Sequence, residues 1–282
     1  MNTIKIIKAS GEKVLFERDK LIASLINAGA SKVITHKITD DIEASLHENI
    51  TTKEIYRTAF KELYKHSRAV ASRYKLKRAI MELGPTGYPF EKFVGELLKH
   101  QGYRVKVGVI VQGNCVQHEV DVVAEKDNKH FMIECKFHNS VNIKCNVKVP
   151  LYIQSRFLDV EKQWVKKSGH EHKFHQGWVV TNTRFTKDAI QYGNCIGLKL
   201  LSWDFPEKGS LRELIGISGL YPITCLNTLK KSEKQKLIEK NIVLCKHLCA
   251  TPEVLNEINI SENRRKNILE DAYQLCSNVI LN

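Results

Sequence analysis

The fold is decided by residues 118–138, which read HEVDVVAEKDNKHFMIECKFH. Apolar residues flank the charged positions at both ends of this stretch, and the polar residues 125–129 between them are typical of a turn, so we predict a β-hairpin. Because side chains alternate between the two faces of a strand, Glu134 and Lys136 share one face, and the hairpin brings Asp121 beside them.

Two carboxylates and an ammonium at the edge of a sheet suit a divalent cation, an attacking water molecule and a phosphate. The alternative is a surface salt bridge, since acidic and basic residues at such spacing also arise by chance. The surrounding sequence favours the first interpretation, because Glu134 and Lys136 lie within an otherwise apolar strand, where a charge is usually paired, metal-bound or functional. The stretch therefore predicts metal-dependent cleavage of phosphodiesters.

Length and composition set the limits of the assignment. The chain has 282 residues and a mass of 32.3 kDa, enough for two or three domains with proper cores. It has no apolar run long enough to span a membrane, and the start MNTIKIIKAS is too short and polar for a signal peptide, so we expect a cytoplasmic protein with no membrane partner. Its cysteines form no Cys-x-x-Cys pair and are expected to be reduced.

The chain is strongly basic, with a formal net charge of +13 and a pI of about 9.3. The excess of lysine and arginine is spread over the whole chain, which is typical of a folded protein that binds polyanions such as DNA, RNA or nucleotides. Two clusters of candidate zinc ligands lack the paired spacing that zinc sites usually have. They comprise His170, His172 and His175, and Cys245, His247 and Cys249.

The first 83 residues read as a hairpin followed by helices. Strand-like runs surround a turn at 9–12, and Gly84-Pro85-Thr86-Gly87 marks a domain boundary. The predicted helices span 19–28, 37–48, 53–65 and 68–82, the third beginning at the capping sequence Thr51-Thr52-Lys53-Glu54.

This segment resembles an ATP-cone, a small nucleotide-binding regulatory domain. The resemblance rests on motifs at 6–11, 20–21, 52–55 and 71–74. It implies a mostly helical domain with a β-hairpin over residues 1–83, in which Lys8 and Lys20 contact the phosphates of ATP or dATP and Thr52 lies near the base or sugar. Ala9 stands where the family usually has a basic residue, so the alternative is a cone that serves only dimerisation or DNA docking.

From Tyr88 the pattern changes to a mixed α/β order of helix, three strands, helix, strand, helix and strand. The elements are expected near 90–98, 103–111, 119–124, 131–137, 147–167, 177–183, 185–193 and 198–203. Residues 86–206 resemble the PD-(D/E)XK nuclease fold and its Mrr-like restriction endonuclease branch. The likeness lies in the opening PFEKFVGELLKHQGY, in Asp121, in the Glu-x-Lys pair and in VVTNTRFTKDAI.

That resemblance implies a role for each motif residue. Glu91, Asp121, Glu134 and Lys136 are expected to be catalytic. Asp121, Glu134 and the main-chain carbonyl of Cys135 are expected to hold Mg²⁺ or Mn²⁺. Lys136 would orient the attacking water or stabilise the developing charge.

Two places depart from the Mrr-like pattern or are not fixed by it. His118 stands where glycine is commoner, and it is either an assisting group or a hydrogen-bonded structural residue. Tyr152, Gln154 and Arg156 lie on the following predicted helix, and which of them corresponds to the polar helix residue of the family stays open.

The last segment, 222–282, is expected to be a small all-α domain whose short helices resemble tandem helix-hairpin-helix units. Such units bind the DNA backbone or mediate protein contacts. The usual hairpin glycines are missing from the turn at 258–261, so both roles stay open. The basic residues 264–266 either contact phosphates or form a solvated helix face.

Together these features predict a metal-dependent DNA endonuclease of the restriction or antiviral defence type, regulated by ATP or dATP. Its expected partners are DNA, an adenine nucleotide and further copies of the same chain. Two alternatives stay open: a nucleotide-sensing DNA-binding regulator whose nuclease fold is non-catalytic, and a structure-specific DNA repair nuclease. The intact set of Asp121, Glu134 and Lys136 argues against the regulator.

Overall fold

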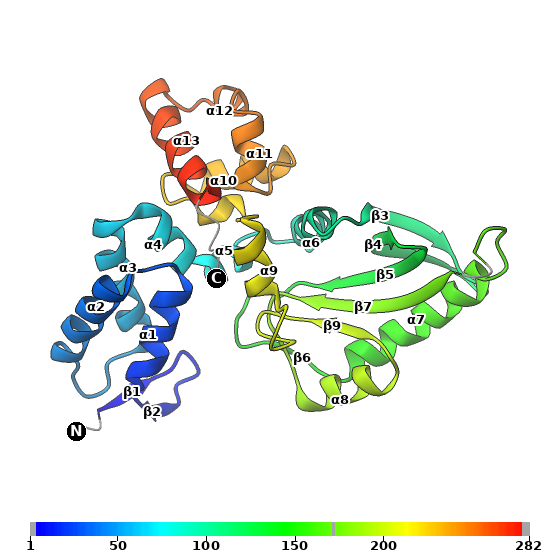
Figure 1. Ribbon diagram of the computed structural model, residues 1–282, viewed down its shortest axis with the longest axis horizontal. Coiled ribbons are helices and arrows are strands. Elements are labelled where there is room, and N and C mark those ends of the chain that lie inside the picture. The colour runs from blue at the N-terminus through cyan, green and yellow to red at the C-terminus, as the bar shows by residue number, and fades with distance from the viewer. Residues whose placement is uncertain (1–3, 171–172, 278–282) are drawn as a thin grey trace.

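The computed structural model describes residues 4–170 and 173–277, which fall into three parts (Figure 1). A hairpin and helices form the N-terminal part, a five-stranded sheet between helices forms the middle, and short helices form the C-terminal part. The predicted mixed α/β class is therefore confirmed. Within the described ranges, no helix combines the length and apolar character that crossing a bilayer requires.

The N-terminal part confirms the predicted hairpin and corrects two helices. The second helix begins at Lys32 rather than at 37, because the hydroxyl of Ser31 accepts the N–H of Ile34 and caps the helix there. The predicted helix 68–82 is interrupted at Lys75. The elements are β1 (Lys5–Ile7), β2 (Lys13–Leu15), α1 (Arg18–Asn27), α2 (Lys32–Ala44), α3 (Thr52–His66), α4 (Arg68–Tyr74) and α5 (Leu76–Met81).

The predicted capping sequence before α3 forms a complete capping box. The hydroxyl of Thr51 accepts the N–H of Glu54, and the carboxylate of Glu54 accepts the N–H of Thr51 at 2.8 Å. This box also fixes the chain beside the hairpin, because Thr51 forms a parallel bridge with Ile7 of β1. The start of α3 is thereby held next to the first strand.

The central sheet has the strand order β3-β4-β5-β7-β9. The strands β3, β4 and β5 are antiparallel neighbours, whereas β5, β7 and β9 run parallel. The predicted hairpin is β4–β5, and Asp127 and Asn128 at its tip both have positive φ, as a two-residue type I′ turn requires. The strands are β3 (Arg104–Gln112), β4 (Gln117–Lys126), β5 (Lys129–Lys136), β7 (Phe174–Thr181) and β9 (Lys199–Leu201), with a separate pair β6 (Lys144–Cys145) and β8 (Arg184–Phe185).

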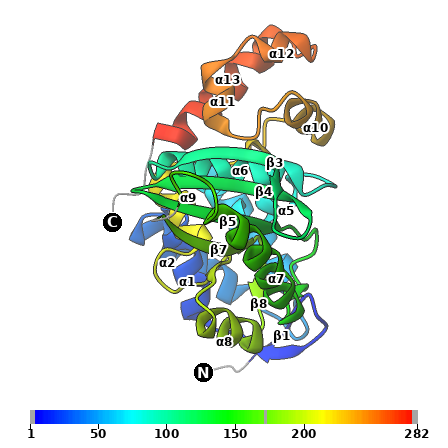
Figure 2. The ribbon, with the colours of Figure 1, turned by 90° about the vertical axis from the view of Figure 1, so that its right-hand side faces the viewer.

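Helices cover both faces of this sheet. On one face α6 (Tyr88–His100) packs through Phe90 and Phe93. On the other face α7 (Lys148–Trp164) and α8 (Lys187–Cys195) pack against Met132 and Val179. Figures 1 and 2 show the C-terminal helices on the side of α6, away from α7 and α8.

The first two strands of the sheet bend at Gly108 and Asp121. The pairing of β3 with β4 passes over these two residues, and Gly108 has φ 63°, a conformation that glycine adopts without strain. Buried side chains on either side of the bend face different layers: Val122 packs with the α6 layer and Val120 with the α7 layer. The bend therefore places Asp121 at the point where the buried side chains of β4 change from the α7 layer to the α6 layer.

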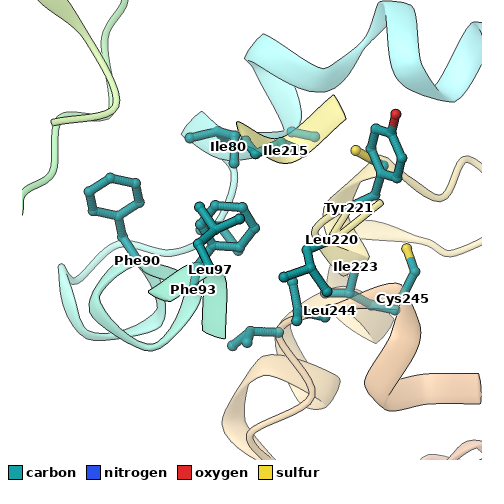
Figure 3. Close-up of a cluster of buried hydrophobic side chains, with 14 of the residues drawn as sticks. Ile80, Phe90, Phe93, Leu97, Ile215, Leu220, Tyr221, Ile223, Leu244 and Cys245 are labelled. Carbon is teal, nitrogen blue, oxygen red and sulfur yellow. The ribbon is translucent and has the colours of Figure 1, made fainter. Parts of the chain in front are cut away.

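The C-terminal helices share a hydrophobic core with the middle part. Figure 3 shows Ile80 of α5, Phe93 of α6, Ile215 of α9, and Leu220 and Leu244 converging in one cluster. The segment between the two predicted domains, 207–221, contains a helix of its own and belongs to this core. The helices are α9 (Leu211–Ser218), α10 (Lys231–Glu239), α11 (Cys245–Ala250), α12 (Val254–Glu257) and α13 (Glu262–Ser277), with a short 3-10 turn η1 (Ile223–Cys225).

Asparagine takes the place of glycine in the turns of the C-terminal helices. Asn241 and Asn259 have φ values of 65° and 62°, in the left-handed region that asparagine tolerates better than most residues. Arg264 is engaged within the protein, because its guanidinium bonds both oxygens of Glu233 and the carbonyl of Thr228. This internal pairing differs from both roles that the sequence leaves open for Arg264, which are contact with phosphates and a solvated helix face.

Gly177 of β7 lets α7 approach the sheet closely. A Cβ atom there would lie 2.6 Å from Cδ2 of Leu198 and 3.1 Å from Cγ of Phe157. We expect Gly177→Ala to lower the free energy of unfolding by about 1–3 kcal/mol, measured by denaturant titration. Gly216→Ala in α9 is the control, because its new Cβ would meet nothing within 4 Å and alanine favours a helix. An equal loss in the control would contradict this account.

Candidate functional site

The hairpin brings Asp121, Glu134 and Lys136 to one cavity. Val122 pairs with Ile133 in the register of β4 and β5, so Asp121 and Glu134 are the next residues along their strands. All three charged residues line a cavity of about 370 Å³ together with Cys135. The Glu134 side chain is buried, with a relative exposure of 6%, whereas Lys136 is exposed.

Asp121 is held in place by the neighbouring strand. Its Oδ2 atom accepts the main-chain N–H of Cys135 at 2.7 Å. Burial raises the pKa of Asp121, and this hydrogen bond acts in the opposite direction. The carboxylate is therefore fixed in position at the bend and partly withdrawn from water.

Glu91 adds a third carboxylate to the same region from the first turn of α6. Burial and the charges of Asp121 and Glu119 raise the pKa of Glu91 to about 7. Burial and the charge of Asp121 likewise raise the pKa of Glu134 to about 8, and Glu91 contributes to that shift. The four predicted catalytic residues thus lie in one region, although Glu91 is not among the residues that line the cavity.

Arg156 of α7 is the main residue that sequence reasoning did not assign. Its guanidinium pairs with the carboxylate of Glu134 at 2.5 Å and donates to the main-chain carbonyl of Glu119. The signal was present in the sequence, because Lys148, Tyr152 and Arg156 recur every four residues on one helix face, and all three line the cavity.

The carboxylate oxygens of this site suit a hard cation, because their present contacts leave some of their negative charge uncompensated. The Oε1 atom of Glu134 is buried without a hydrogen-bond partner, and the raised pKa values of Glu91 and Glu134 reflect burial and negative charge that a cation would offset. Within the described ranges, no three histidine, cysteine or acidic side chains already converge as metal ligands. Arg156 contacts Oε2 of Glu134, so Oε1 is the oxygen of this carboxylate that a cation would meet without displacing the guanidinium.

Other candidates from the sequence have structural partners instead. His118 lies 2.8 Å from Asp159, which also accepts the N–H of Cys115 and so ties α7 to the loop before β4. In the second zinc cluster, Cys245 is buried and donates to a main-chain carbonyl, and His247 contacts Glu96. Of the first cluster, His172 lies outside the described residues.

The N-terminal part has a cavity of its own. Lys8, Lys20 and Thr52, which the ATP-cone resemblance assigns to nucleotide binding, all line a cavity of about 350 Å³ between the hairpin, α1 and the start of α3. That volume is in the usual range for small-molecule sites. Lys8 and Lys20 are exposed and pair with Glu12 and Glu17, so each ammonium is available to exchange its partner for an anion.

Comparisons with known proteins agree with the three parts. Residues 4–82 match the ATP cone domain, residues 84–204 match a restriction endonuclease family, and residues 221–276 match the C-terminal region of AF1548-like proteins. An uncharacterized protein of Archaeoglobus fulgidus is 41% identical over 180 residues, which are 64% of this chain and 97% of that protein. The crystal structure of AF1548, a protein of unknown function, is 38% identical, covers 68% of this chain and 99% of its own, and superposes with a TM-score of 0.56.

The raised pKa of Glu134 makes stability depend on pH. Its pKa rises from the ordinary value of 4.5 to about 8, so its contribution to stability is fully present below pH 4.5 and is lost as the pH rises through about 8. Glu134→Gln should remove this loss and give a melting temperature at about pH 9 that exceeds the wild type by roughly 2–4 °C or more. The exposed Glu48→Gln is the control, and equal pH profiles for wild type and Glu134→Gln would rule out the shift.

Proposed function

This chain belongs to the AF1548-like family, and we propose that it is a metal-dependent DNA endonuclease controlled by an adenine nucleotide. The observation that carries the nuclease half is the cavity at the bend of the sheet, where Asp121, Glu134 and Lys136 meet within a restriction-endonuclease domain. The basic character of the chain suits DNA as the substrate.

Asp121, Glu134 and the main-chain carbonyl of Cys135 would hold Mg²⁺ or Mn²⁺. When bound, the ion would polarise the scissile phosphate and lower the pKa of a water molecule. Glu91 would support this carboxylate set from the α6 side. Its raised pKa means that it carries a proton for part of the time near neutral pH, and a nearby cation would favour its ionised form.

Lys136 and Arg156 would act on the phosphate. The exposed ammonium of Lys136 faces the same cavity as the two carboxylates, where a fixed positive charge stabilises negative charge that develops in the transition state. The guanidinium of Arg156 suits bidentate phosphate contacts once Glu134 releases it.

The ion pair between Arg156 and Glu134 is the observation that favours the main alternative, a nucleotide-sensing DNA-binding regulator. The guanidinium of Arg156 is bound to Glu134, which is one of the two acidic side chains that a metal would need. A non-catalytic protein would keep this pair, whereas a nuclease would exchange it when metal and DNA bind. Cleavage assays with plasmid, linear and methylated DNA, with Mg²⁺ or with a chelator, distinguish these two possibilities.

The regulatory half of the proposal rests on the cavity that Lys8, Lys20 and Thr52 line. The two ammonium groups that line it suit the phosphates of ATP or dATP, and the apolar and aromatic side chains that line it suit the base. Tyr56 and Tyr74 stack at the inner wall, with ring centroids 5.1 Å apart. We infer that nucleotide binding changes nuclease activity or the association of chains.

We expect Glu134→Gln and Asp121→Asn to abolish Mg²⁺-dependent cleavage while DNA binding persists, because they remove metal ligands and keep the side-chain shape. Lys136→Ala should lower the cleavage rate by roughly a hundredfold or more. Glu125→Gln, at the far end of β4, is the control and should cleave normally. Cleavage by Glu134→Gln at the wild-type rate would refute the assignment, and a wild type that binds DNA without cutting it would support the regulator.

ATP or dATP should raise the melting temperature, because a ligand that binds only the folded state stabilises it. Lys8→Ala and Lys20→Ala should each reduce that increase and leave nucleotide-free stability nearly unchanged, since both side chains are exposed. Lys61→Ala on the exposed face of α3 is the control. Calorimetry that detects no binding at millimolar concentration would mean that the cone has lost its ligand.

A further inference from the structure

A further cavity lies where the N-terminal part meets the middle part. It has a volume of about 300 Å³ and is walled by α1, α4, α5, α9 and the residues that follow β9. Figure 1 shows α5 and α9 between the N-terminal helices and the sheet. We call it the junction cavity, and the lining residues that matter are Lys20, Arg73, Lys77, Trp203, Arg212 and Tyr221.

The junction cavity concentrates positive charge. Four of its lining residues are basic, and among the described lining residues none is acidic. Burial lowers the pKa of Lys77, and the charges of Arg184 and Arg212 lower it further. The charge of Asp204 raises the pKa of Lys77, but this carboxylate is already paired with Arg184 at 2.6 Å. Lys20 pairs with Glu17, which lines the cone cavity, so the excess charge of the junction cavity comes from Arg73, Lys77 and Arg212.

Arg73 is the least satisfied group in this cavity. Its side chain is buried, with a relative exposure of 8%, and its Nε and Nη2 atoms have no hydrogen-bond partner. Its guanidinium lies 5.8 Å from the ring centroid of Tyr221, a contact that leaves these N–H groups unsatisfied. A buried donor without an acceptor is costly, and a phosphate oxygen would supply the missing acceptor.

The side of the cavity formed by α9 and the residues that follow β9 contributes both charge and an aromatic wall. Trp203 follows β9, and the ammonium of Lys77 lies 5.8 Å from the centroid of its indole ring. Arg212 lies in the first turn of α9, is exposed, and donates its main-chain N–H to the carbonyl of Trp203. An anion in the cavity would thus contact helices of the N-terminal part, Trp203 of the restriction-endonuclease part and α9 at once.

The junction cavity adjoins the predicted nucleotide site. Lys20, Ser24 and Tyr74 line both cavities, so one face of α1 forms a shared wall. Lys20 in particular is placed between them, because its ammonium extends from that shared face and is largely exposed. The two cavities therefore lie side by side, with Lys20 common to both.

We propose that the junction cavity is a phosphate-binding site, in which Arg73, Lys77 and Arg212 hold the terminal phosphates of a nucleotide whose base and first phosphate lie in the adjoining cone cavity with Lys8 and Lys20. This inference rests on the proposed nucleotide binding by the cone. It goes further in two respects. The protein would distinguish nucleotides by their number of phosphates. Arg212 of α9 would contact the ligand directly. The ligand would then bridge the two parts and favour one arrangement of them.

Calorimetric titration of the full chain with ATP, ADP and AMP tests the proposal. Arg212→Gln should weaken ATP binding by about tenfold or more, the effect of losing a charge-assisted contact, while AMP binding changes little. Lys77→Gln should act in the same way. Arg57→Gln, an exposed arginine of α3 that lines neither cavity, is the control and should bind like the wild type. Arg212 is the lead position because an exposed side chain can be replaced without unfolding the protein.

The outcomes separate this inference from the cone assignment. If the wild type and both variants bind ATP equally well, the junction site is refuted and nucleotide binding by the cone stands. If the wild type binds no nucleotide, the regulatory half of the proposed function fails, and tripolyphosphate becomes the probe. Binding of tripolyphosphate that Arg212→Gln abolishes would support a phosphate site filled from another source, and absence of binding to the wild type would overturn the site.

Discussion

Carboxylates withdrawn from water at the bend of the sheet impose the strongest constraint on this structure. Each one loses hydration, and each neighbour of the same charge adds to the cost. Glu134 is kept in place by Arg156, and Asp121 by the N–H of Cys135. These partners come from α7 and β5, so helix and hairpin must pack in one register for any of the charges to be tolerated. Gly177 contributes to this packing, because a side chain there would collide with Phe157 of α7.

The same constraint explains why α6 and α7 lie on opposite faces. α6 delivers Glu91 from one layer and α7 delivers Arg156 from the other, and the bend at Gly108 and Asp121 is where a strand can meet both. A straight strand would point its acidic residue toward one layer alone. The geometry of the candidate site and the layer packing are therefore set by the same irregularity.

Local features could be predicted from the sequence, and contacts between distant elements could not. The hairpin follows from alternation and a polar turn, and the start of α3 from its capping sequence, because neighbouring residues determine both. The start of α2 was missed because Ser31 is a cap without an acidic residue three positions later. Arg156 was seen and left unassigned, because its partner depends on how α7 crosses the sheet. The junction cavity depends on the placement of two parts, which no periodicity encodes.

The core that joins α5 to the C-terminal helices has a consequence for how the chain acquires its structure. The hydroxyl of Thr224 donates to the carbonyl of Ala79, 145 residues earlier, and Arg68 reaches Asp271 across 203 residues. During synthesis the apolar side of α5 emerges long before the segments that bury it. Such distant pairings close slowly, because the intervening loop must first lose its freedom. The nascent chain thus carries exposed hydrophobic surface until nearly all of it has been made, a period in which aggregation competes with folding.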